Sequence, residues 1–421
     1  MNLVNRLFKG DRVIWFILIA LSLISFIEVY SATSTIAYKD GNYLGPIIRH
    51  ASFLLGGFAL ILVIHNIPSR FFSLLIIVLP VSILLLIFTL FFGVEINGSN
   101  RWLNLFGFRF QPSEVAKLAC IVYVSFLLSR RNKFTDTQIF KYILIGVSVV
   151  CALIFSENFS TSVILFLTCS LMMFIGGISL KKMGLLFAAL LVSGAFLVCL
   201  LSYVLPDDVV KKSDSMAKIK HRTEDFFSKS PPLSAETYKI DDYNRQETFA
   251  KVAIASGGLG KFPGYGQQRD TLPQAYSDFI YAIIIEEMGL IAGFFVLFLY
   301  LILLIRVGTI ARKCEKLFPK FLVLGCGLLI GVQALANMAV VVGLFPVTGQ
   351  PLPLVSRGGT STLITCFYFG IILSISRFGA GMGNEEDEVE EDNDEDVIEL
   401  ETDISDKTPM TVVENLAEAK A

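Results

Sequence analysis

The chain places one acidic residue, Asp278, at the head of a long apolar run from Ser277 to Ile305. A carboxylate beside hydrocarbon is costly unless it faces a partner or a water-filled cavity, so such a residue indicates a functional site. A carboxylate in a cavity can accept a proton as a general base. The alternative is a structural role, in which Ser277 caps the helix and Asp278 lies in its first turn, where the helix dipole stabilises negative charge.

Two further carboxylates, Glu286 and Glu287, follow in the same run. In a continuous helix they would lie ~12 Å beyond Asp278, at about 1.5 Å per residue. Steps of about 100° per residue place Glu286 roughly 80° around the helix from Asp278 and Glu287 on the opposite face. We therefore expect both residues to be structural, with Glu287 holding helices together rather than contacting the same substrate as Asp278.

A second polar cluster lies in NGSNRWLNLFGFRFQPSEVAK, residues 97–117. Glu114 and Lys117 are three residues apart, so they share a helix face and can pair. Alternatively, Lys117 extends toward the membrane surface and Glu114 complements the helix N-terminus. Arg101 and Trp102 are candidates for substrate binding or, alternatively, an anchor at the membrane interface. Gln111 is a further candidate for substrate binding.

The third cluster lies in PVTGQPLPLVSRGGTS, residues 346–361. Its prolines and glycines exclude a regular helix, and irregular backbone at membrane depth is tolerated only inside protein or along a cavity. Ser356, Arg357, Thr360 and Ser361 could donate hydrogen bonds to an anion. Asn337, earlier in the chain, is predicted to join helices rather than to bind a ligand.

The composition predicts the elements that must position these clusters. Hydrophobic residues make up 54% of the 421 residues and charged residues 17%, and the mean hydropathy is +0.66. Such a chain is too apolar for a soluble protein of this length. Because about 20 apolar residues cross a bilayer as a helix, we predict an all-α polytopic membrane protein with ten transmembrane helices, at 13–33, 47–67, 71–93, 113–129, 139–156, 160–179, 184–205, 277–305, 320–345 and 360–378.

The distribution of Lys and Arg predicts the orientation of these helices. With an interior N-terminus, the inner segments hold sixteen of these residues and the short outer loops five. Both termini are therefore predicted to be cytoplasmic. Residues 1–12 would form the N-terminus, 13–378 the membrane domain and 379–421 a tail, and residues 206–276 a large extracytoplasmic loop between helices seven and eight.

Three other features limit the interpretation. The glycine-rich stretch at 257–266 could cradle a ligand or form a flexible loop. The tail carries 16 acidic residues from Glu385 to Glu418, which predicts disorder; it is either a solvated tail or a docking segment for a basic partner. Neither a disulfide framework nor the spacing of a metal site is visible among the seven cysteines.

On this topology all three clusters share the outer face. Arg and Lys hold phosphate oxygens, and a carboxylate accepts a proton from an attacking hydroxyl. The arrangement therefore suits an anionic, lipid-linked substrate handled at the outer leaflet.

At these same residues the chain resembles the SEDS family (shape, elongation, division and sporulation), whose members polymerise the glycan of peptidoglycan. The resemblance covers residues 10 to 380, and the opening residues look more like those of the division members than of the elongation members. Five motifs carry it in order: NGSNRWL, FQPSEVAK, ASGGLG, LPQAYSDFIYAIIIEEMG and PLPLVSRGGTS.

The resemblance implies that Asp278 matches the family's catalytic aspartate and that Glu114 and Lys117 match its polar pair. It implies lipid II, a disaccharide-pentapeptide on undecaprenyl pyrophosphate, as substrate, and a β-1,4 glycan made by one inverting displacement. Arg101, Lys117 and Arg357 would then hold the departing pyrophosphate. Tyr276-Ser277 stands where the family usually has His-Thr, Arg357 where Tyr is common, and Gln268 near a usual Ser, with an insertion-like KFPGYG before it.

The same resemblance implies a class B penicillin-binding transpeptidase and other division proteins as partners, no nucleic acid, and a place in the inner membrane at the division septum. No cofactor is certain, although Mg²⁺ or Mn²⁺ could accompany the pyrophosphate. Three other interpretations stay open: an elongation polymerase, a lipid II flippase and a structural scaffold. A flippase is less favoured because the polar clusters lie on the outer face rather than at the midplane, and no inverted repeat is visible.

Overall fold

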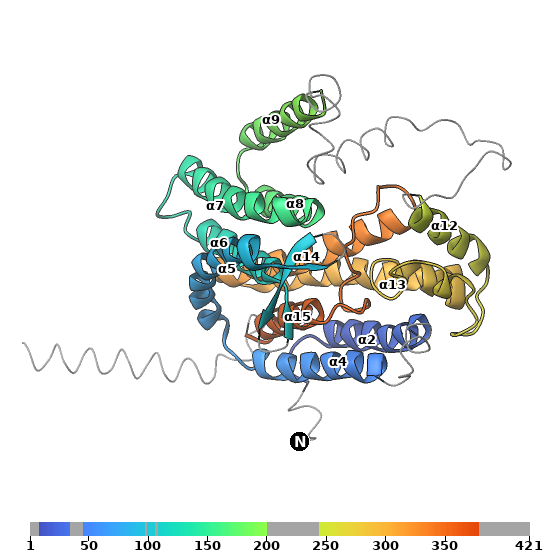
Figure 1. The fold of residues 1–421 in the computed structure, drawn as a ribbon. Helices are drawn as coiled ribbons and strands as arrows, with labels where there is room; N and C mark the ends of the chain where they lie inside the picture. Colours follow the sequence, from blue (N-terminus) through green and yellow to red (C-terminus); the bar gives the residue numbers. More distant parts are fainter. Residues whose placement is uncertain (1–7, 34–44, 97–98, 106–107, 200–243, 379–421) are drawn as a thin grey trace, which may run out of the picture.

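The computed structural model describes residues 8–33, 45–96, 99–105, 108–199 and 244–378, and it is a bundle of membrane-length helices (Figure 1). Within these ranges, eight helices are long and apolar enough to cross a bilayer. They are α2 (Arg12–Ala32), α4 (Gly45–Ile64), the 3-10 helix η1 (Ser69–Ile77) continued by α5 (Val78–Phe92), α6 (Pro112–Ser129), α7 (Asp136–Glu157), α13 (Ile280–Lys313), α14 (Leu317–Val341) and α15 (Thr360–Phe378).

Two other apolar helices, α8 (Phe159–Ile175) and α9 (Leu180–Cys199), occupy the positions of predicted spans six and seven. The predicted tail lies outside the described residues, as do residues 200–243, which comprise the end of predicted span seven and residues 206–243 of the predicted outer loop. The rest of that loop contains an additional helix, α12 (Arg245–Gly257), and a 3-10 turn, η3 (Gln268–Asp270).

Polar residues between the apolar runs decide where several helices begin. Asp11 caps α2, because its Oδ1 accepts hydrogen bonds from the backbone N–H groups of Val13 and Ile14. Asn158 separates α7 from α8 and caps α8 by accepting from the N–H of Thr161. These caps pair backbone donors that a helix start otherwise leaves without partners.

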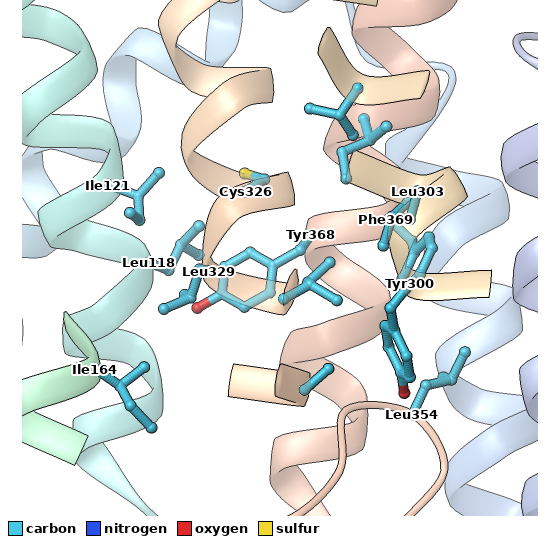
Figure 2. Packing of buried hydrophobic residues seen from close by; sticks show 14 of the residues in the cluster. Leu118, Ile121, Ile164, Tyr300, Leu303, Cys326, Leu329, Leu354, Tyr368 and Phe369 are labelled. Carbon is cyan, nitrogen blue, oxygen red and sulfur yellow. The ribbon is translucent and has the colours of Figure 1, made fainter. Parts of the chain in front are cut away.

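Helix α14 is central, with α6, α8, α13 and α15 packed around it. Figure 2 shows the buried core at this junction, where Leu118 and Ile121 lie near Cys326 and Leu329, and Tyr368 lies beside them. A Cβ at Gly327 or Gly331 of α14 would stand 2.6 Å from a side-chain carbon of α13. Small residues at these positions therefore let the two helices approach closely.

The prediction of an all-α protein was wrong for the segment between α5 and α6. Strands β1 (Val94–Ile96), β2 (Ser99–Leu105) and β3 (Phe108–Phe110) form an antiparallel sheet in the order β1-β2-β3. Val94 pairs with Trp102, and Leu103 with Phe110. The short chain between α5 and α6 satisfies backbone groups by this pairing, and the sheet fixes the position of Arg101 and Trp102.

The predicted continuous helix from 277 to 305 was also wrong. Helix α13 begins at Ile280 and is interrupted at Gly289, whose φ of 87° and ψ of 171° are non-helical. The hydroxyl of Tyr281 donates to the carbonyl of Gly293 at 3.1 Å, although twelve residues of straight helix would separate them by about 18 Å. The chain therefore reverses at Gly289, and residues 280–288 fold back on the long part of α13.

The end of α12 stabilises this reversal. The N–H of Lys261 donates to the carbonyl of Glu287 at 2.6 Å, and that of Leu290 to the carbonyl of Gly258 at 3.2 Å. A Cβ on Gly260 would be 2.6 Å from the carbonyl of Met288. Only glycine permits this approach and the positive φ of Gly289, so the predicted glycine-rich loop is an ordered part of the fold.

The irregular segment between α14 and α15, residues 342–359, enters the bundle as its prolines predicted. Ser25 of α2 donates to the carbonyl of Val355 at 2.7 Å, and Tyr300 of α13 to that of Pro353 at 2.5 Å. Tyr300 is fully buried and lies beside Leu354 in Figure 2. Irregular backbone is satisfied here by side chains of the surrounding helices.

Candidate active site

A pocket of about 90 Å³ lies at the end of the bundle where α6, α8 and α15 begin. We call this end of the bundle the site face. Residues from all three predicted clusters line the pocket: Arg101, Trp102, Gln111, Glu114, Ser277, Asp278, Arg357 and Ser361, together with Asn158, Gly349, Gln350, Pro351 and Gly358. The sequence therefore predicted most of the residues that tertiary structure gathers here.

Hydrogen bonds to three consecutive backbone carbonyl groups, those of Tyr276, Ser277 and Asp278, hold the segment that carries Asp278. The N–H of Arg357 donates to the carbonyl of Tyr276 at 3.0 Å, and Ser356 Oγ donates to that of Ser277 at 2.5 Å. Asn337 Nδ2 donates to the carbonyl of Asp278 at 2.8 Å. Each donor is buried or partly buried, so the segment before α13 is fixed at the pocket without being helical.

Asp278 therefore lies in a loop that precedes α13. The alternative interpretation, in which Ser277 caps the helix and Asp278 lies in its first turn, was wrong. Phe279 is the residue preceding the first turn, and its side chain makes no capping bond. Ser277 Oγ instead donates to Asp278 Oδ1 at 2.6 Å. A Cβ built on Gly349 would lie 3.5 Å from Oδ2, so the absence of a side chain at Gly349 keeps space open beside that oxygen.

Electrostatics at Asp278 favour a proton acceptor. Burial raises the pKa of this carboxyl above its usual value, while the hydrogen bond from Ser277 and the nearby positive charge of Arg101 oppose the rise. Within the described residues no cation lies within ion-pair distance of Asp278. The carboxylate therefore keeps lone pairs available for a substrate hydroxyl.

Two guanidinium groups line the same pocket as this carboxylate. Arg101 comes from β2, and the Nε of Arg101 has no hydrogen-bond partner among the described residues. Arg357 lies over the ring of Tyr276 at 5.2 Å, and burial lowers the pKa of its guanidinium while Tyr276 opposes the change. Both side chains line the pocket, and guanidinium groups are suited to phosphate oxygens.

Glu114 and Lys117 form the ion pair that their spacing predicted, at 2.9 Å between Nζ and Oε1. Lys117 is only 1% exposed and is not a lining residue of the pocket. Its Nζ also donates to Gln333 Oε1 at 3.1 Å, and Gln333 Nε2 donates to the carbonyl of Pro351 at 3.1 Å. Lys117 thus lies behind Glu114 and neither extends to the membrane surface nor reaches the position of a pocket phosphate.

Ser356 and Thr360, which were predicted to donate hydrogen bonds to an anion, do not line the pocket. Ser356 Oγ donates to Ser277 and accepts from the N–H of Leu352 at 2.8 Å, so it holds two backbone segments together. Thr360 is absent from the pocket lining, and its hydroxyl is buried without a partner among the described residues. Asn337 donates to Asp278 and, at 2.7 Å, to the carbonyl of Gln350, which is a positioning role.

Glu286 and Glu287 hold the glycine-rich segment rather than line the pocket. Glu287 accepts from the N–H groups of Gly264 and Gly266, at 2.7 and 3.2 Å, and from Ser31 Oγ at 2.7 Å. Glu286 accepts from the N–H groups of Gln267 and Gln268, at 2.8 and 3.1 Å. The predicted helical angle relative to Asp278 does not apply, since α13 begins only at Ile280 and Asp278 lies before it.

Sequence reasoning missed Asn158 and Gln350. Asn158 follows Glu157 within an otherwise apolar stretch, and this interruption was the available signal. Gln350 belongs to the third motif, and its Nε2 donates to Thr161 Oγ1 at 2.8 Å. In the described part of the chain, no group of three or more His, Cys, Asp or Glu side chains could hold a metal ion.

The chain is similar over most of its length to known proteins. The model of a cell cycle protein family, which groups FtsW, RodA and SpoVE, matches residues 11–380. A protein of Geobacter sulfurreducens named a probable peptidoglycan glycosyltransferase FtsW is 31% identical over 384 residues, 89% of this chain and 96% of the relative. Peptidoglycan glycosyltransferase MrdB of Escherichia coli is 30% identical over 376 residues, 87% and 93% of the two chains.

Two solved structures have the same fold. One, described as "Structural coordination of polymerization and crosslinking by a peptidoglycan synthase complex", aligns with a TM-score of 0.68 at 22% identity over 88% of this chain and 99% of the other. The rod shape determining protein RodA of Thermus thermophilus aligns with a TM-score of 0.61 at 22% identity, over 87% and 97% of the two chains.

Proposed function

Since this chain belongs to the SEDS family of peptidoglycan glycosyltransferases, which are multi-pass membrane proteins, we propose that it polymerises lipid II into β-1,4 glycan with Asp278 as the general base. One observation carries the assignment: the Asp278 carboxylate is fixed through its backbone, lacks an ion-pair partner among the described residues, and lies in a pocket with Arg101 and Arg357. A fixed base in a pocket with two cations matches the charges of a pyrophosphate-linked donor sugar.

In the proposed reaction, Asp278 accepts the proton of the acceptor 4-hydroxyl as its oxygen attacks the anomeric carbon of the donor. The bond from that carbon to the pyrophosphate breaks, and Arg101 and Arg357 stabilise the charge of the leaving group. A single displacement inverts the α-linked donor into a β-linked product. Lys117 does not line the pocket and would not hold the pyrophosphate; it pairs with Glu114, which does line the pocket, and fixes the position of that carboxylate.

The pocket also limits how the substrate binds. Its volume of about 90 Å³ is below the ~300–1,000 Å³ typical of pockets that enclose a small molecule. The reacting hydroxyl and anomeric carbon would enter, with the remaining sugar, peptide and lipid over the mouth of the pocket. Trp102, Gln111 and Gln350 line it and would contact the sugar nearest the reaction.

The test is incubation of purified protein with lipid II in detergent, followed by separation of glycan strands by length. Strands that a muramidase digests, formed by the native chain and not by Asp278→Asn, would support the proposal. Movement of lipid II across vesicle bilayers without polymerisation would instead indicate a flippase. Equal polymerisation by both chains would exclude Asp278 as the base.

Ten transmembrane helices with both termini in the cytoplasm remain our proposal for the topology. The eight membrane-length helices support this topology, and ten crossings would result if α8, of 17 residues, and α9, of 20, also cross the membrane. The site face would then be extracytoplasmic, within a membrane domain of residues 13–378. Reporter fusions at residues 133 and 230, on opposite sides of the membrane by this topology, test it.

We further propose a role in division, as an FtsW-like polymerase, with a class B penicillin-binding transpeptidase as partner at the septum. The similarity of the opening residues to division members supports the role, and the shared fold with a chain from a peptidoglycan synthase complex supports the partner. The acidic tail, 379–421, would serve recruitment and not chemistry. Truncation after Asn384 should preserve polymerisation in detergent, and copurification with the transpeptidase and imaging of a fluorescent fusion test the rest.

A further inference from the structure

A second cavity lies at the opposite face of the bundle, among the ends of α2, α13 and α15. Its volume of about 270 Å³ is three times that of the active-site pocket, and its lining includes four cationic side chains: Arg12, Arg306, Lys313 and Arg377. The lining holds a single carboxylate, Asp11. The formal charge of the lining is therefore strongly positive.

Both oxygens of the Asp11 carboxylate already have hydrogen-bond partners. Its Oδ1 caps α2, and its Oδ2 accepts from Arg306 Nε at 2.6 Å. Arg377 donates to Asn66 at 2.8 Å. Arg12 and Lys313 have no hydrogen bond or ion pair with any described residue, so their charges are available to a ligand.

Basic residues at helix ends generally report the orientation of a membrane protein, so charge alone would not indicate a site. Two other cations at this face are paired with a carboxylate: Arg131 lies 2.9 Å and Lys182 lies 3.8 Å from oxygens of Asp136. The cluster around Arg12 differs because it lines a cavity whose one carboxylate is already paired.

Exposed apolar stripes run from this cavity along the two helices that carry the free cations. Phe16 and Leu23 are 60% and 59% exposed on the same side of α2 as Arg12, and Ile305 and Phe298 are 71% and 57% exposed on α13. At about 100° per residue, the two α13 residues lie within roughly 80° of Lys313. Helices α2 and α13 are packed together, so the stripes lie on neighbouring helices.

We propose that this cavity binds the phosphate of an anionic phospholipid, with the acyl chains along α2 and α13. Cations at the depth of the lipid headgroups meet the phosphodiester, and the exposed stripes below them meet hydrocarbon. Basic pockets between membrane helices bind anionic headgroups in this way. On the proposed orientation, the lipid belongs to the cytoplasmic leaflet, a bilayer away from Asp278.

Native mass spectrometry of the full chain, with dioleoyl phosphatidylglycerol or dioleoyl phosphatidylcholine added, tests the site. The double variant Arg12→Gln and Lys313→Gln removes the two free cations and leaves the Asp11–Arg306 pair intact. It should weaken phosphatidylglycerol binding about thirty-fold, from about 1 kcal/mol per cation near the membrane surface. Lys133→Gln with Lys141→Gln is the matched control, because both lysines are exposed on the same face.

Equal weakening in the test and control variants would overturn the proposal, as would equal affinity of the native chain for the two lipids. Competition by inorganic phosphate at the lipid concentration would show a site for free phosphate instead. Binding that appears only after truncation at Asn384 would assign the cavity to the acidic tail. A tenfold or greater selective loss in the test variant, with an unchanged thermal unfolding midpoint in lipid-free detergent, would support a lipid site.

Discussion

The side-chain amide of Asn337 donates to the backbone carbonyl of Asp278, 59 residues away in the chain, at 2.8 Å. The same amide donates to Gln350 at 2.7 Å, so α14 holds both the carboxylate segment and the wall of the pocket facing it. Both amide hydrogens of Asn337 are used. Asn337 is therefore a positioning residue, and it acts on the reaction only through the placement of Asp278.

Replacement of Asn337 by Leu should lower kcat roughly ten- to hundred-fold with little change in KM, because small misplacement of a reacting group has effects of this size. It also leaves two carbonyls without donors, at about 1–3 kcal/mol for a buried group. Polymerisation kinetics on lipid II and thermal unfolding in detergent measure both effects. Asn132→Ala, at an exposed position, is the control, and an unchanged kcat in Asn337→Leu would show that Asp278 is positioned without it.

Replacement of Asp278 by Asn should reduce polymerisation by about 10²–10⁴-fold, the usual contribution of a general base. Stability should not fall. Because burial raises the pKa of Asp278, its ionised form destabilises the folded state, and that cost is present above the folded pKa. The variant should unfold at the same or a higher temperature than the native chain near pH 7.5, and a clearly lower midpoint would point to a structural carboxylate.

Polymerisation should increase with pH as Asp278 loses its proton, with an apparent pKa above the usual aspartate value of 3.8. Ser277 donates to the ionised carboxylate and so favours it. Ser277→Ala removes this bond, so the profile should move to higher pH. Rates of glycan synthesis across a pH series give the apparent pKa values, and a shift toward lower pH would contradict the proposed geometry.

The buried pair of Glu114 and Lys117 should be strongly coupled. Lys117→Met leaves the carboxylate of Glu114 without its cation, which costs about 3–5 kcal/mol for a buried pair. Adding Glu114→Gln removes the unpaired charge, so the double variant should be more stable than Lys117→Met alone. Denaturant unfolding of the two single variants and the double variant measures the coupling, and strict additivity would show independent residues.

Glu287 should control the order of the glycine-rich segment. Glu287→Gln replaces one acceptor oxygen by a donor, so the N–H of Gly264 or of Gly266 loses its partner. Amide hydrogen exchange at residues 258–268 should become faster by roughly tenfold or more, from about 1–3 kcal/mol per unsatisfied buried group. Glu247→Gln on α12, which breaks an exposed pair with Lys251, should leave this exchange unchanged.

The sequence alone was sufficient to predict the class of protein and most of the site. Long apolar runs predicted membrane helices because about 20 apolar residues are needed to cross the hydrocarbon core. Prolines and glycines predicted the irregular segment after α14. Arg101, Glu114, Asp278 and Arg357 were expected on one face, and all four line one pocket. The pairing of Glu114 with Lys117 followed from helical spacing, which is a local property.

Only tertiary structure decided the roles that depend on distant partners. Hydropathy predicts one helix over residues 277–305. The reversal at Gly289 depends instead on two backbone hydrogen bonds, one accepted by the carbonyl of Gly258 and one donated by the N–H of Lys261. Ser356 has the chemistry of an anion donor, yet its hydroxyl is bound to Ser277, 79 residues away. A residue's type and local period limit what it can bind, but which partner it meets is fixed by how the helices pack around α14.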